Sequence, residues 1–210
     1  TDGRYAAVCD YKTGSPKLSL NEIMEGLSLQ LITYLLALSK TKDTKDLLPA
    51  AMMYIYLHGR PKSISVPPNG IPHAKEKENT NGIFLNDPDV LRTLDSQSGT
   101  DDGFIGVSYV KDGSVKKTSP VLTAEEFEAL KALTEKILIR LYSRLESGEI
   151  AIHPVKNGTL SPCSYCPYRS ICRFDPALPE NSFDYISKVS DKTIREKLDE
   201  EMKRNGKENL

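Results

Sequence analysis

The stretch YAAVCDYKTG at residues 5–14 decides the fold of this chain. Its apolar start and polar end predict a buried strand over residues 5–12, and the glycine-containing segment that follows predicts a turn. Alternate residues of a strand point to the same side, so we expect Asp10 and Lys12 to share one face at the end of the strand. Cys9 should then point to the opposite side, into the core.

Asp10 and Lys12 are chemically suited to the hydrolysis of phosphodiesters. A carboxylate can hold Mg²⁺, which positions and activates water, and an ammonium group can orient that water or stabilise charge on the phosphate. The spacing alone is weak evidence, because the polar run 40–46 contains Asp43 and Lys45 at the same separation. Only the first copy ends an apolar strand and precedes a turn and a helix, which favours a functional role for it.

A helix is expected over residues 20–38. Ser19, with Glu22 three places later, is typical of a capping box, and apolar residues then recur at helical spacing. Gln30 and Tyr34 lie on one face of this helix, since they are four residues apart. Next to a metal–carboxylate centre they could hydrogen-bond a phosphate backbone or water. The alternative is a glutamine at the helix edge and a tyrosine in the core.

Further elements are expected along the chain: a buried strand at 50–57, a short helix at 86–94, a hairpin at 103–117 and a long helix at 123–147. The remainder of 61–102 lacks periodicity and is expected to form loops. After Pro179 the sequence is polar with sparse apolar residues, which predicts a solvated or frayed helix. We therefore expect an α/β core over 1–160, an irregular cysteine segment over 161–185 and a polar tail over 186–210.

Three of the four cysteines gather in the segment CSYCPYRSIC, at Cys163, Cys166 and Cys172. Thiolates with this spacing can turn inward on one soft metal centre, either zinc or an iron–sulfur cluster. Three thiolates do not complete a four-ligand site. Cys9 is expected in the core and His153 is a weak candidate, so the remaining ligand is expected upstream of the first residue.

The composition narrows the classes of function. The 210 residues include 28 Lys and Arg against 29 Asp and Glu, a net charge of −1. A free-standing nucleic-acid binder usually has a basic excess, so a nucleic acid would have to meet local patches. Weak candidates for such patches are Lys111, Lys116, Lys117, Arg169 and Arg173. No apolar run reaches the ~18 residues of a membrane span, and no signal peptide opens the chain. The cysteine usage indicates a reducing compartment, and the start without methionine indicates a fragment.

Three motifs together resemble one family: DYKTG at 10–14, GLSLQLITYL at 26–35 and the Cys-x2-Cys-x5-Cys run. They are similar to the RecB-like nucleases of the PD-(D/E)xK superfamily that carry an iron–sulfur staple. The match looks closest to the AddB family of bacterial ATP-dependent helicase–deoxyribonucleases. The resemblance extends to about Tyr185 and includes residues 49–56, 82–87 and 148–154.

The resemblance implies an α/β, restriction-endonuclease-like core that lacks its first elements. It implies that Asp10 is a ligand for Mg²⁺, that Lys12 is the catalytic lysine, and that Gln30 and Tyr34 form an accessory motif. The three clustered cysteines would bind a [4Fe–4S] cluster whose fourth cysteine lies outside this chain. The family's other metal-binding carboxylate, on the strand before Asp10, has no match here, so the isolated fragment could be inactive.

The resemblance also implies partners and a biological setting. The parent enzyme would act on DNA in the bacterial cytoplasm, together with an AddA-type helicase–nuclease subunit. It would process double-strand ends for recombinational repair, and this domain would cut the 5′-terminated strand.

Two other interpretations stay open. A Cas4-like iron–sulfur exonuclease shares the same motifs, although the long stretch between Tyr34 and Cys163 favours the AddB family. A non-catalytic module would use its cysteines as a structural clasp on DNA or on a partner, and Asp10 and Lys12 would then form only an ion pair.

Overall fold

The computed structural model describes residues 4–14, 16–57, 61–65, 73–76, 80–100, 103–179 and 181–208, without the side chains of 61–65, 73–76 and 205–208. The strands are β1 (Tyr5–Lys12), β2 (Leu48–Tyr56), β3 (Pro61–Ser65), β4 (His73–Glu76), β5 (Thr80–Leu85), β6 (Val121–Leu122), β7 (Val155–Lys156) and β8 (Asp184–Tyr185). The helices are α1 (Leu20–Met24), α2 (Gln30–Lys40), α3 (Pro88–Leu94), α4 (Ala124–Glu146), α5 (Arg169–Cys172) and α6 (Asp191–Glu208), with a 3₁₀ turn, η1, at Pro162–Ser164.

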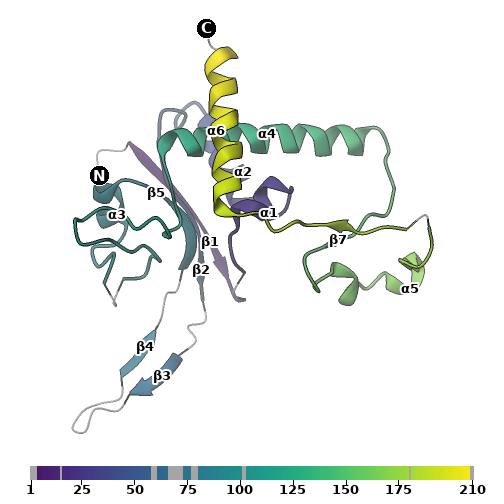
Figure 1. The fold of residues 1–210 in the computed structure, drawn as a ribbon, viewed down its shortest axis with the longest axis horizontal. Helices are drawn as coiled ribbons and strands as arrows, with labels where there is room; N and C mark the ends of the chain where they lie inside the picture. The colour runs from purple at the N-terminus through teal and green to yellow at the C-terminus, as the bar shows by residue number, and fades with distance from the viewer. Residues whose placement is uncertain are drawn as a thin grey trace.

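A four-stranded mixed sheet in the order β1–β2–β5–β6 forms the centre of the fold (Figure 1). β1 and β2 are parallel, β2 and β5 are antiparallel, and β5 and β6 are parallel. The strands predicted at 5–12 and 50–57 are confirmed as β1 and β2. The helix predicted at 86–94 is confirmed as α3, which the Asp87 side chain caps. The expected α/β class therefore holds.

Of two predictions for the segment between 61 and 117, one is wrong and the other holds in part. β5 is an inner strand of the sheet, although its sequence falls in a region that was expected to form loops. The predicted hairpin at 103–117 turns at Gly113 as expected, with φ +85°. Within its described residues, however, it forms a single β-bridge between Tyr109 and Val115 and no paired strands.

The two faces of the sheet carry separate cores, as the alternation of side chains along β2 requires. Ala50, Met52 and Tyr54 face the helical layer, where residues of α2, α4 and α6 complete one buried cluster. Ala51 and Met53 face the opposite side, where α3 and the segment 105–107 complete a second. The sheet is therefore covered on both faces over β2 and β5.

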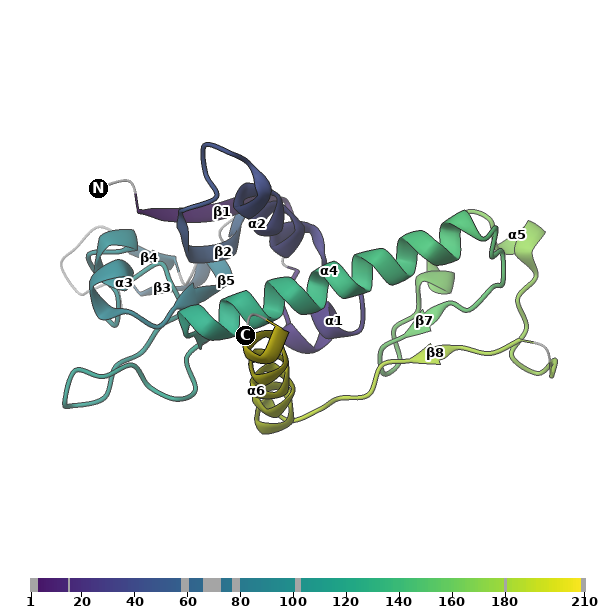
Figure 2. The same ribbon diagram turned by 90° about the horizontal axis from the view of Figure 1, so that it is seen from above.

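α4 is the long helix predicted from Thr123, and α6 packs across it (Figures 1 and 2). The predicted capping box is confirmed: the Glu126 backbone N–H donates to Thr123 Oγ1 at 3.2 Å, and the Thr123 N–H donates to Glu126 Oε2 at 2.8 Å. α6 adds Ile194 and Leu198 to the helical core. The predicted helix is therefore present, but it is packed on the core and is not solvated or frayed, because residues four apart place these apolar groups on one face of the helix.

The single helix predicted after the first turn is two helices, α1 and α2. Between them the backbone passes through positive φ at Gly26 (83°) and at Ser28 (50°), which an α-helix cannot accommodate. Ser28 Oγ donates to Glu22 Oε2 at 2.8 Å, so the Glu22 carboxylate holds the turn between the two helices. As a result, Gln30 is the first residue of α2 and does not lie in the middle of a long helix.

The cysteine arm, residues 155–185, lies beyond the C-terminal end of α4 (Figures 1 and 2). β7 and β8 pair in parallel at its base, and η1 and α5 are its short helical turns. No described residue of the arm is fully buried. None of the described helices is long and apolar enough to cross a membrane.

Candidate active site

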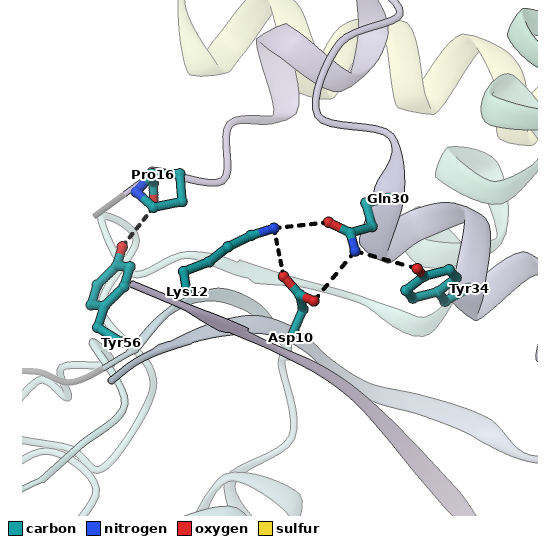
Figure 3. Close-up of polar contacts among 6 residues, drawn as sticks. All are labelled: Asp10, Lys12, Pro16, Gln30, Tyr34 and Tyr56. Atoms are coloured by element: carbon teal, nitrogen blue, oxygen red, sulfur yellow. Dashed lines mark hydrogen bonds and ion pairs between the residues drawn. The ribbon is translucent and has the colours of Figure 1, made fainter. Parts of the chain in front are cut away.

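The four predicted side chains meet where the end of β1 lies against the first turn of α2 (Figure 3). Lys12 Nζ lies 2.7 Å from Asp10 Oδ2 and donates to Gln30 Oε1 at 3.0 Å. Gln30 Nε2 lies 3.3 Å from Asp10 Oδ1 and 3.3 Å from Tyr34 Oη, as donor to both. The strand spacing therefore places Asp10 and Lys12 on one face, as predicted, and the helix supplies the polar groups opposite them.

Gln30 connects the cationic and anionic halves of this cluster. Its amide oxygen accepts from the Lys12 ammonium, while its amide nitrogen donates to the Asp10 carboxylate. An amide has both a donor and an acceptor, so it can satisfy two opposite charges at once. The side chain of Tyr34 is 49 % exposed, so the predicted alternative of a core tyrosine does not hold.

Lys12 lies between a carboxylate and an aromatic ring. Its Nζ is 5.1 Å from the centroid of the Tyr54 ring, which is within the range of a cation–π interaction. The hydrogen bond to Asp10 is the main cause that raises the pKa of Lys12, and the charge of Asp10 adds to it. The side chains of Asp10 and Lys12 are 23 % and 30 % exposed, so solvent and substrate can reach both. Lys12 is therefore held as an ammonium group beside the carboxylate.

Tyr54 and Asn81 belong to the same row of the sheet as Asp10, although nothing in the sequence pointed to them. Asp10 is opposite Tyr54 in the register of β1 and β2, and Tyr54 is opposite Asn81 in that of β2 and β5. Tyr54 is buried, and this burial raises its pKa. Asn81 Oδ1 accepts from the Leu18 backbone N–H, so it anchors the segment that leads into α1. Register between strands decides this row, and one chain's sequence does not reveal it.

The Asp10 carboxylate fits a divalent metal ion. Its Oδ2 is buried and lies 2.7 Å from Lys12 Nζ, while its Oδ1 accepts from Gln30 Nε2. Mg²⁺ is commonly held by one or two carboxylates while substrate phosphates and water complete its shell. Across the described parts of the chain, no three His, Cys, Asp or Glu side chains gather closely enough to hold a metal ion. A metal ion held by Asp10 would take its further ligands from water, substrate oxygens or groups outside the described residues.

Cys163, Cys166 and Cys172 line one pocket of about 340 Å³ in the cysteine arm, together with Lys156, Arg169 and Phe183. The three thiols are free and at least partly exposed, and they do not converge on one point within the described residues. Their type and common location fit a thiolate-bound cluster, but the three side chains would have to turn inward to hold it.

Neither Cys9 nor His153 lies with the three cysteines. Cys9 points away from Asp10, as expected, but its side chain is exposed, so the prediction of a core position is wrong. β1 is an edge strand, and the second core does not extend over it. His153 Nδ1 lies 3.2 Å from Ser182 Oγ and does not line the cysteine pocket.

The five basic residues that were weak candidates for phosphate contacts lie in different parts of the structure. Lys117 lines a different pocket, of about 510 Å³, and Arg169 lines the cysteine pocket. Lys111, Lys116 and Arg173 are exposed.

Comparison with known proteins agrees with this geometry. A sequence model described as the PD-(D/E)XK nuclease superfamily matches residues 1–173. Among relatives named as the B subunit of an ATP-dependent helicase/deoxyribonuclease, that of Desulforamulus reducens is 32 % identical over 197 residues, which cover 90 % of this chain and 17 % of the relative. The protein of Clostridium kluyveri is 33 % identical over 198 residues, with coverage of 90 % and 17 %. That of Clostridium acetobutylicum is 30 % identical over 213 residues, with coverage of 97 % and 18 %.

The chain thus spans less than a fifth of the length of these curated relatives. The match to the superfamily covers most of the chain and includes β1, α2 and the first turns of the cysteine arm. On this evidence, the chain belongs to the PD-(D/E)XK nuclease superfamily.

Proposed function

We propose that this chain is a Mg²⁺-dependent deoxyribonuclease domain in which Asp10 holds the metal ion and Lys12 is the catalytic lysine. The observation that carries the proposal is the contact network of Asp10, Lys12, Gln30 and Tyr34 at the end of β1. Membership of a nuclease superfamily and similarity to proteins named as parts of a deoxyribonuclease support the same reaction.

Each residue has a task that follows from its position. Bound Mg²⁺ would supply positive charge that stabilises the phosphate in the transition state and would favour ionisation of water. Lys12 is a cation in fixed contact with Asp10, so it can stabilise the negative charge that builds on the phosphate oxygens. Gln30 keeps Lys12 and Asp10 in place through both ends of its amide. Tyr34 is about half exposed and its Oη accepts from Gln30 Nε2, so its O–H group can donate a hydrogen bond to the substrate backbone.

The wider setting is part of the proposal. The names of the relatives describe one component of a helicase/deoxyribonuclease, which supports a role next to an AddA-type partner in cutting DNA ends for repair. Cutting of the 5′-terminated strand and a cytoplasmic location remain predictions. Cys163, Cys166 and Cys172 would bind a [4Fe–4S] cluster that stabilises the arm, with the fourth ligand from outside this group. All four cysteines are free of disulfides, as this requires.

The sharpest test compares Asp10→Ala with Asp43→Ala. Asp43 has the same spacing to a lysine but is exposed in the turn after α2, so it is a matched control. The variants are made in the full-length parent protein, and cleavage of end-labelled single-stranded and duplex DNA is measured while Mg²⁺ is titrated from zero. We expect wild type and Asp43→Ala to cut only with metal, and Asp10→Ala to lose cutting. Undiminished cutting by Asp10→Ala would disprove the assignment and would favour the non-catalytic clasp.

A further inference from the structure

Glu22, in the short helix α1, contacts both the cysteine arm and the turn that leads into the candidate active site. Its Oε1 accepts from Asn157 Nδ2 of the arm at 3.1 Å, and its Oε2 accepts from Ser28 Oγ at 2.8 Å. Asn157 is 135 residues away from Glu22 along the chain. Hydrogen bonds to a carboxylate are stronger than those between neutral groups, so one side chain connects two distant parts of the fold.

Glu22 also holds the turn between α1 and α2 through its backbone. Its carbonyl oxygen accepts from the Leu27 N–H at 2.8 Å, while the Gly26 N–H donates to the Ile23 carbonyl oxygen at 3.0 Å. This pair of bonds is a common way to end a helix at a glycine with positive φ. Ser28 then takes a second positive φ, of 50°. Such a conformation costs energy in a residue other than glycine and persists where contacts hold it, and the hydrogen bond to Glu22 is such a contact.

The first turn of α2 depends on this connection because no side chain caps it. Leu29 is the N-cap and makes no side-chain hydrogen bond, whereas α1, α3 and α4 each begin with a side-chain cap. Gln30 is the first residue of α2 and follows Ser28 by two positions. A shift of the turn would therefore move the amide that contacts Lys12 Nζ and Asp10 Oδ1.

The cysteine arm meets α1 at both of its base strands. Asn157 directly follows β7, and Ser187 lies two residues after β8. The Asn21 side chain donates to the Ser187 carbonyl oxygen at 3.0 Å, next to the contact of Glu22 with Asn157. Figure 1 shows the segment between β8 and α6 as it passes α1. Because β7 and β8 pair with each other, the base of the arm holds α1 from both strands.

We propose that Glu22 is a positioning residue for DNA cleavage, which holds Gln30 against Asp10 and Lys12 and is itself held by Asn157 of the arm. The proposal rests on the deoxyribonuclease function above. Glu22 has no hydrogen bond or ion pair with Asp10 or Lys12 in the described part of the chain. Its effect on the reaction therefore passes through the turn and the amide of Gln30.

The first test removes the carboxylate in the full-length parent protein. Glu22→Ala is compared with Glu25→Ala, which removes the same charge at an exposed position at the end of α1. Cleavage of a labelled DNA strand is measured with saturating Mg²⁺ over a range of DNA concentrations. Glu22→Ala should lower kcat by about 10- to 100-fold at unchanged KM, because a displacement of ~1 Å can cost as much as ~10²-fold. Glu25→Ala should cut as wild type does.

Two further variants distinguish positioning from a general loss of structure. Glu22→Gln keeps an oxygen for the Ser28 hydroxyl, and the Asn157 amide can turn to accept from the new amide nitrogen, so this variant should restore most of kcat. Groups that act as a unit have non-additive effects. Glu22→Ala added to Gln30→Ala should therefore lower kcat by less than about twofold beyond Gln30→Ala alone. A general loss of structure would multiply the two effects.

The link to the arm has a readout that needs neither metal nor cleavage. Hydrogen–deuterium exchange of residues 28–34 is followed by mass spectrometry in EDTA. Asn157→Ala and Glu22→Ala should both speed this exchange, because each releases the turn before α2. Asn181→Ala removes a hydrogen bond to the Asp175 carbonyl oxygen within the arm, so it should leave the exchange at 28–34 unchanged.

The positioning role is overturned if Glu22→Ala keeps the kcat of Glu25→Ala, or if its effect multiplies with that of Gln30→Ala. Equal exchange at 28–34 in Asn157→Ala and Asn181→Ala would overturn the link to the arm. Ser28→Ala removes the donor of the same hydrogen bond and takes the place of Glu22→Ala if that variant does not fold.

Asp10→Ala separates this proposal from the deoxyribonuclease function. If Asp10→Ala abolishes cutting while Glu22→Ala leaves it unchanged, only the positioning role is wrong. If Asp10→Ala still cuts, the deoxyribonuclease assignment and the positioning role that rests on it are both wrong.

Discussion

The candidate active-site cluster, formed by Asp10, Lys12, Gln30 and Tyr34, and the cysteine arm show two ways in which this chain places reactive groups. Asp10 and Lys12 are fixed by the register of a sheet that is covered on both faces over β2 and β5, and Gln30 is fixed by a helix that packs on that sheet. Cys163 and Cys172 lie in short helical turns of an arm without a fully buried described residue. The first set is already in mutual contact, whereas the thiols share a pocket without converging.

The difference follows from the amount of apolar surface that each region buries. Burial of side chains offsets the entropy cost of ordering the chain, so a region with a core can hold polar groups at fixed distances. A segment of about 30 residues cannot bury enough surface alone and usually needs a metal or disulfides. We therefore expect the active-site cluster to be pre-organised and the arm to gain its final geometry from a ligand.

The largest effect should come from Lys12→Ala. Removing a group that stabilises transition-state charge typically lowers the rate by about 10²–10³-fold. The side chain is partly exposed, so the fold should remain, which circular dichroism checks. Lys45→Ala, which removes an exposed lysine of the same spacing motif, should leave the rate of DNA cleavage unchanged. Equal rates in the two variants would show that the pre-organised cluster has no catalytic role.

The next effect concerns the core that supports the cluster. Leu198 is fully buried against the helical layer, so Leu198→Ala should lower the free energy of unfolding by about 2–5 kcal/mol. Lys203→Ala, on an exposed face of α6, should change it by less than about 0.5 kcal/mol. Urea unfolding measures both. A small effect of the leucine variant would restore the interpretation of α6 as a solvated tail.

The arm should respond to its thiols without affecting the core. After anaerobic reconstitution of the full-length parent protein with iron and sulfide, wild type should show the broad absorbance of an iron–sulfur cluster, and Cys166→Ser should lose it. Cys9→Ser, an exposed cysteine on β1, should keep it. The arm of Cys166→Ser should be cut faster by protease, while urea unfolding of the core changes by less than about 0.5 kcal/mol. A colourless wild-type protein that contains zinc would replace the cluster with a zinc site.

The smallest effect is a dependence of stability on alkaline pH. The pKa of Lys12 is raised in the folded state, mainly by its hydrogen bond to Asp10. Its contribution is therefore complete below the unfolded value of about 10.4 and is lost as pH rises through the higher folded pKa. Wild type and Lys12→Arg are compared by urea unfolding between neutral pH and alkaline pH, because arginine stays charged throughout. If the free energies of unfolding of the two proteins changed with pH in parallel, the ion pair would not contribute to stability.

The sequence predicted the parts of the fold that local pattern controls. β1, β2 and α4 follow from apolar runs, period and a capping box, and the pairing of Asp10 with Lys12 follows from strand alternation. The break before α2 was missed because Ser28, unlike glycine, rarely adopts positive φ and gave no signal. α6 was underestimated because its apolar stripe is narrow within a polar sequence, and only tertiary packing on α4 stabilises it.

The contacts that depend on register could not be predicted in the same way. Tyr54 and Asn81 lie in one row with Asp10 because of the register between β1, β2 and β5. The spacing of residues within one strand does not determine that register. β5 was missed for a related reason, since its short segment at 80–85 becomes a strand by pairing with β2. The exposure of Cys9 likewise depends on which strand is at the edge of the sheet.

The amide of Gln30 has a consequence for the way this nuclease can change by mutation. One nucleotide substitution converts a glutamine codon into a glutamate codon, and another converts it into a lysine codon. Glutamate would keep an acceptor for Lys12 but oppose Asp10, and lysine would keep a donor for Asp10 but oppose Lys12. Each replacement needs only one nucleotide change, but it places a repulsive charge in the cluster. A protein with either one should keep its fold and lose the cleavage of DNA.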